Sequence, residues 1–93
     1  MPTLTEERRT YMAEISATFT NNYGESRQWA IWDTGIDPNS PKLLFNDYLA
    51  PGASTAQNLY SADGIYGSAR YQRSDGAAQV VDSITDGSQV SME

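Results

Sequence analysis

The sequence predicts an all-β fold, namely a small antiparallel β-sandwich of about seven strands, immunoglobulin-like or jelly-roll-like, with a short N-terminal helical or flexible segment. Three observations predict it. Short segments rich in β-branched and aromatic residues recur between turn residues. Asp-Gly, a common hairpin dipeptide, begins at Asp63, Asp75 and Asp86. After residue 20 no segment has the 3.6-residue periodicity of a helix, so β-α-β units are not expected.

The N-terminal segment differs from the rest of the chain. We expect residues 1–11 to form an appendage and residues 12–93 to form one sandwich domain. Thr3 and Glu6 have the spacing of a capping box, which predicts a helix over residues 4–10. Such a segment could cover a sheet edge.

Residues 12–20 fit both a helical and a strand pattern, and their β-branched and aromatic side chains favour a strand. The alternation and the turn dipeptides predict the remaining strands. These are expected at residues 27–33, 42–49, 55–61, 65–73, 79–84 and 89–92.

Strand alternation also predicts which side chains form the core. The expected core contains one of the two tryptophans together with Ile15, Phe19, Ile31, Leu43, Phe45, Leu59, Ile65, Tyr71, Val80 or Val81, Ile84 and Val90. Because Trp29 and Trp32 are three residues apart, a regular strand would direct them to opposite faces. One of them is therefore expected outside the core unless a bulge or the N-terminal segment intervenes.

Composition excludes several kinds of chemistry. The chain has no cysteine and no histidine, which excludes disulfides, thiolate nucleophiles and catalytic imidazoles. A net charge of −6 argues against direct nucleic-acid binding. No apolar run is long enough for a membrane span, and no secretory signal is expected, so a cytoplasmic location is the default expectation.

The leading functional hypothesis is a non-enzymatic binding or assembly module with an aromatic surface. Trp32, Tyr48, Tyr60 and Tyr66 fall on faces that are not predicted as core, and Trp29 takes the role of Trp32 if the facing is reversed. Arg70 could form a cation–π or ion-pair contact beside Tyr66 or Tyr48, although protection of a sheet edge by its charge is the favoured interpretation. Such a surface suits a protein partner, a second copy of the chain or a glycan.

Two further hypotheses stay open. A small acidic protein can occupy a basic site on a larger macromolecule and so mimic nucleic acid. Alternatively, Asp33, Asp37 and Asn39 lie close together in one loop region and could contribute to a calcium site, because calcium prefers oxygen ligands. No other cofactor is expected, and no residue pattern predicts catalysis.

Overall fold

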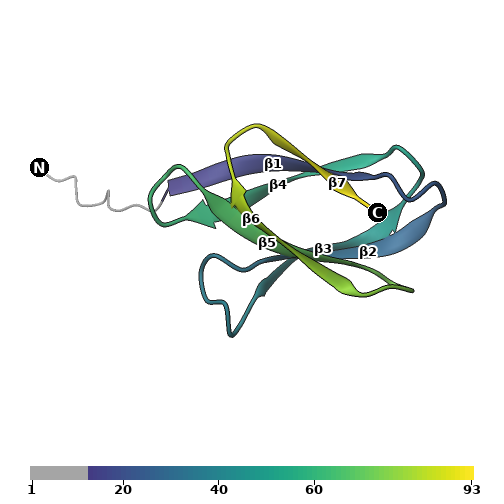
Figure 1. Ribbon diagram of the computed structural model, residues 1–93, viewed down its shortest axis with the longest axis horizontal. Helices are drawn as coiled ribbons and strands as arrows, with labels where there is room; N and C mark the ends of the chain where they lie inside the picture. Colours follow the sequence, from purple (N-terminus) through teal and green to yellow (C-terminus); the bar gives the residue numbers. More distant parts are fainter. Residues whose placement is uncertain (1–12) are drawn as a thin grey trace, which may run out of the picture.

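The computed structural model describes residues 13–93, which form seven strands in two sheets packed face to face (Figure 1). The predicted helix at residues 4–10 and the appendage at 1–11 lie outside the described residues. The strands are β1 (Ala13–Asn21), β2 (Arg27–Asp33), β3 (Lys42–Leu49), β4 (Ser54–Ser61), β5 (Gly67–Arg73), β6 (Ala78–Ile84) and β7 (Ser88–Met92).

One sheet has the strand order β4-β1-β7 and the other has the order β3-β2-β5-β6. Four of the five strand pairs are antiparallel, but β1 and β7 run parallel, so the prediction of a purely antiparallel sandwich is wrong at this pair. The parallel pair joins the first and last strands of the described chain, which no hairpin connects. Figure 1 shows β1, β4 and β7 together in the upper layer.

The three Asp-Gly dipeptides do not all close hairpins. Asp75-Gly76 lies in the turn between the paired strands β5 and β6, where the Gly76 N–H donates to the carbonyl of Arg73. The dipeptides at Asp63 and Asp86 instead lie where the chain crosses from one sheet to the other. Gly64 and Gly87 have positive φ angles but none of the aspartates does, so these turns are not type I′.

The core lies between the sheets and contains both layers' inward side chains. Its buried apolar members are Ile15, Ala17, Phe19, Trp29, Ile31, Leu49, Leu59, Ala69, Tyr71, Ile84, Val90 and Met92. Most of the predicted core is confirmed, and Phe45 and Val81 pack against it half-buried. Leu43 and Ile65 are exposed, so their assignment to the core is wrong. Of the alternatives Val80 and Val81, Val81 packs against the core and Val80 is exposed.

Each of these three exposed positions has a local cause. The pairing shifts from Ile31–Phe45 to Trp32–Leu43, so Leu44 is the extra residue of a bulge, and Leu43 takes the outward face of Trp32. Ile65 precedes β5, which begins at Gly67 and not at residue 65. Val80 pairs with the outward-facing Arg70.

Candidate functional site

The outer face of the four-stranded sheet carries the candidate site. Strand register places outward side chains in rows that run across the strands. One row joins Tyr48 and Gln28, the next joins Asn46, Ala30, Gln72 and Ala78, and the third joins Leu43, Trp32, Arg70 and Val80. Neighbouring rows are about 7 Å apart, because residues two apart on a strand share a face.

A stacked pair occupies the centre of the third row. The guanidinium carbon of Arg70 lies 4.4 Å from the centroid of the Trp32 ring. This is a cation–π contact between neighbouring strands, and its aromatic partner is Trp32 and not the predicted Tyr66 or Tyr48. Both side chains are half-buried, so the pair keeps an accessible surface on the sheet.

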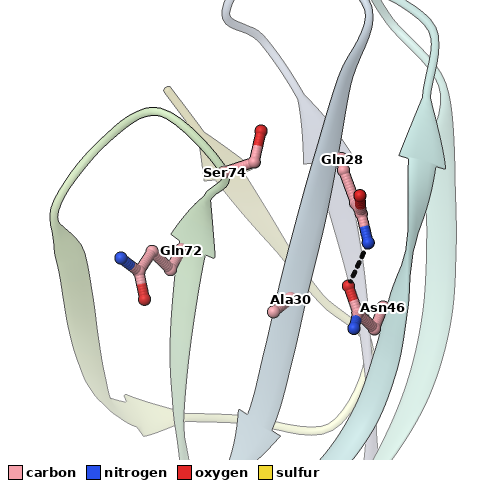
Figure 2. Close-up of a pocket in the computed structure, with 5 residues that line it drawn as sticks. All are labelled: Gln28, Ala30, Asn46, Gln72 and Ser74. Atoms are coloured by element: carbon pink, nitrogen blue, oxygen red, sulfur yellow. Dashed lines mark hydrogen bonds between the residues drawn. The ribbon is translucent and has the colours of Figure 1, made fainter.

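The first cavity on this face has a volume of about 300 Å³ and is lined by Gln28, Ala30, Asn46, Gln72 and Ser74. We call it the amide cavity. In Figure 2 the small side chain of Ala30 lies on β2, with Asn46 on the neighbouring β3 and Gln72 and Ser74 from the β5 side. Ala30 leaves the space that larger side chains would fill.

The amide groups around this cavity are partly held in place. Gln28 Nε2 donates to Asn46 Oδ1 at 2.8 Å (Figure 2), and Gln72 Nε2 donates to the carbonyl of Gly76 at 2.9 Å. Among residues 13–93, this leaves the Gln28 and Gln72 carbonyl oxygens as acceptors and the Asn46 amide as a donor. The bonded pair of Gln28 and Asn46 therefore offers the cavity an acceptor and a donor, whereas the amide of Gln72 points away from Ala30 in Figure 2.

A second cavity of about 260 Å³ lies beyond the stacked pair on the same sheet. We call it the arginine cavity. It is lined by Thr34, Pro38, Pro41, Ser68, Arg70, Val80 and Asp82. The Thr34 hydroxyl bonds to the Ser68 hydroxyl at 2.8 Å, which fixes the two side chains across β2 and β5.

The structure separates the aromatic residues that were predicted to act together. Trp29 is fully buried and packs against Tyr71 with ring centroids 6.0 Å apart, so it cannot contribute to a surface. Trp32 and Tyr48 share the outer face of the four-stranded sheet, two rows apart. Tyr60 belongs to β4 in the other sheet, and Tyr66 lies exposed between β4 and β5.

The candidate calcium ligands Asp33 and Asp37 differ in burial and in the backbone groups that they bind. Asp33 is buried, and its two carboxylate oxygens accept the N–H groups of Gly35 and Tyr60. Asp37 is exposed and accepts the N–H of Asn39 within its own loop. In the described part of the chain no group of three acidic side chains is close enough to hold a metal ion. Calcium binding stays a prediction from the sequence.

The amide residues were missed when the sequence was read alone. Neither Asn46 nor Gln72 is among the residues that the sequence predicts for the core or for a binding site. Gln28 and Gln72 are 44 positions apart in the chain and line the same cavity only through the β2–β5 register. A usable signal was present, since amide side chains alternate with core residues on three separate strands.

The remaining findings do not assign the site. Residues 13–93 include no helix that is long and apolar enough to span a membrane. Comparisons of the chain with protein-family models, with curated proteins and with solved structures found no match.

Proposed function

We propose that this domain is a non-enzymatic carbohydrate-binding module that holds a glycan on the outer face of its four-stranded sheet. The observation that carries the proposal is the amide cavity, which Gln28, Asn46 and Gln72 line together with Ala30, one row from the half-buried ring of Trp32. The finer assignment of the sandwich as immunoglobulin-like or jelly-roll-like also remains a proposal.

The chemistry of the cavity suits sugar hydroxyl groups. A hydroxyl both donates and accepts hydrogen bonds, and primary amides offer the same pair of functions. The Trp32 ring adds an apolar surface for the C–H faces of a pyranose, because an indole combines a large apolar area with a polar edge. None of the amide-cavity residues is charged, which favours a ligand that is rich in hydroxyls at this position.

The arrangement favours a glycan over a broad protein contact. The exposed apolar side chains of the third row, Leu43 and Val80, lie on opposite edge strands of the sheet. Polar side chains occupy the neighbouring row between β3 and β5, so the apolar atoms do not form one continuous patch. Protein interfaces concentrate their binding energy in a central apolar cluster, which this face lacks.

The affinity should be modest. Each neutral hydrogen bond contributes about 0.5–1.5 kcal/mol net, and the open site orders both ligand and side chains at an entropic cost. We expect dissociation constants of about 0.1–1 mM for a single chain, which corresponds to roughly −5 kcal/mol.

Calorimetric titration with neutral hexasaccharides tests the proposal, using cellohexaose, xylohexaose, mannohexaose and chitohexaose as probes. Ala30→Leu fills the amide cavity and should abolish binding while the protein stays folded, because leucine is tolerated on a strand surface. The matched control is Ala56→Leu, which makes the same change at an exposed position on β4 in the other sheet.

Two results would overturn the proposal. One is the absence of binding to every neutral and acidic sugar tested. The other is equal binding by the Ala30→Leu and wild-type proteins. Concentration-dependent dimerisation that Ala30→Leu abolishes, seen by analytical ultracentrifugation, would show instead that a second copy of the chain occupies this face.

A further inference from the structure

We propose that the ligand is a carboxylate-bearing sugar and that Arg70 binds its carboxylate from the arginine cavity. This inference rests on the proposed carbohydrate-binding function and names the chemical class of the glycan. Uronic acids and sialic acids share the required chemistry, which is a pyranose ring that carries a carboxylate.

Arg70 differs from the other arginines of the described chain in having no acidic partner. Arg27 pairs with Glu25 and Asp75, and Arg73 also pairs with Asp75. Within residues 13–93 Arg70 forms no ion pair, and its guanidinium is held only by the Trp32 ring. No ion pair within the described residues therefore neutralises its positive charge.

The orientation of the guanidinium determines which atoms are available. The Nε atom of Arg70 is buried and has no hydrogen-bond partner among the described residues, and the side chain lines the arginine cavity. The Trp32 ring lies against one face of the guanidinium, so the edge with the terminal nitrogens remains for a carboxylate in this proposal. Two terminal N–H groups on that edge match the two oxygens of a carboxylate, and a bidentate pair of this kind is stronger than a neutral hydrogen bond.

Besides Arg70, the arginine cavity contains a hydroxyl group that can donate a hydrogen bond to a ligand. Thr34 Oγ1 donates to Ser68 Oγ, so the hydroxyl hydrogen of Ser68 is left free among the described residues. Asp82 also lines the cavity and is the one acidic side chain among the described residues that line either cavity. The negative charge of Asp82 repels an anion. Removing that charge should therefore strengthen binding of a carboxylate in this cavity.

The two cavities lie on the same face, with the Trp32–Arg70 row between them. From the row of Ala30 and Gln72 to the row of Thr34 and Ser68 is about 13 Å along the strands. We infer that one glycan chain crosses this distance, with a hydroxyl-rich residue at the amides, a ring against Trp32 and a carboxylate at Arg70.

The experiment compares sugars that differ in charge at one position. Oligogalacturonate is titrated against its methyl ester, and 3′-sialyllactose is titrated against lactose, both at about 0.15 M salt, where exposed charges beyond about 8 Å are screened. The readout is the ratio of the dissociation constants that one protein variant shows for the two sugars of a pair. A substitution that changes folding or the Trp32 surface affects both constants equally, so its effect cancels in the ratio. The two arms also distinguish uronic acids from sialic acids.

We expect the wild-type protein to prefer the acidic sugar of one pair by about tenfold, as a charge-assisted bidentate contact predicts. Arg70→Gln should reduce this ratio to about one, and Arg70→Lys should leave it intermediate because lysine keeps the charge but loses the planar fork. Asp82→Asn should increase the ratio. Lys42→Gln makes the same change in net charge as Arg70→Gln at a residue that lines neither cavity, and should leave the ratio within about twofold.

Equal binding of the charged and uncharged sugars would overturn this inference while the proposed function stands. An unchanged ratio in Arg70→Gln would also overturn it, because the preference would then come from another group. Failure of every sugar to bind would overturn the proposed function itself, so the two failures are distinguishable.

Discussion

The Oδ2 atom of Asp33, at the end of β2, accepts the backbone N–H of Tyr60 on β4 at 2.8 Å, so one buried side chain joins the two sheets. Its Oδ1 atom accepts the N–H of Gly35 at 2.9 Å, which turns the chain out of β2. A buried carboxylate is stable when backbone donors satisfy it, and here two of them do.

Asp33→Asn should therefore destabilise the fold. One carboxylate oxygen becomes an NH₂ group that faces an N–H donor, which leaves a buried polar pair unsatisfied at a cost of about 1–3 kcal/mol. Urea unfolding followed by fluorescence measures this cost. Asp37→Asn is the matched control, because that side chain is exposed in a loop and should change stability by less than about 0.5 kcal/mol. Equal losses in both variants would show that the contact between sheets contributes nothing.

The two tryptophans should respond very differently to truncation. Trp29→Ala removes a fully buried ring from the core and should cost about 3–5 kcal/mol. Trp32→Ala removes a half-buried ring and its contact with Arg70, and should cost about 1 kcal/mol or less. The free energies of unfolding in urea decide between them. Comparable losses would mean that Trp32 supports the fold rather than serving mainly as a binding surface.

Replacing Ser83 with glycine should make the folded protein more stable. The pairing of β5 with β6 passes from Ala69–Val81 to Gly67–Ile84, and Ser83 in this bulge has a φ of +60°. This conformation costs an L-residue about 1–2 kcal/mol, and glycine adds about 0.5–1 kcal/mol of unfolded-chain entropy. Ser83→Gly should therefore stabilise the protein by roughly 0.5–1 kcal/mol in thermal or urea unfolding.

The control for Ser83→Gly is Ser26→Gly, because Ser26 is an exposed serine outside the positive-φ region. There only the entropic cost applies, so this variant should be unchanged or less stable. A loss of stability in Ser83→Gly would contradict the assignment of strain to this bulge.

Stability in acid should depend on Asp63. Backbone N–H groups of Tyr66 and Ile65, the first contributing most, lower the pKa of this carboxyl below its ordinary value of 3.8. Because the folded pKa lies below the unfolded pKa, this stabilisation is complete above pH 3.8 and is lost as the pH falls through the folded value.

Asp63→Asn keeps an acceptor oxygen for these N–H groups but does not titrate. Between pH 5 and pH 2 it should therefore lose less stability than the wild-type protein, as measured by urea midpoints at each pH. An identical loss in the two proteins would mean that Asp63 does not contribute to the acid response.

Some of the architecture could be predicted because its causes are local. The β-branched and aromatic side chains of residues 12–20, among them Ile15 and Phe19, favoured a strand over a helix, and the structure has the strand β1 at Ala13–Asn21. Turn residues marked the strand limits to within two residues. The opposite facing of Trp29 and Trp32 also followed from the two-residue period of a strand and is confirmed.

The amino-acid sequence by itself determined that this chain forms strands, because side-chain alternation and turn preferences act over a few residues. Only the tertiary structure decided which strands pair, which tryptophan is buried and where the candidate site lies. Three features depend on packing between distant segments. They are the bulge at Leu44, the chain crossings near Asp63 and Asp86, and the cavity that Gln28 and Gln72 both line. The strand register and the packing of the two sheets are those that minimise the free energy of the whole core. A pattern of a few neighbouring residues does not determine them.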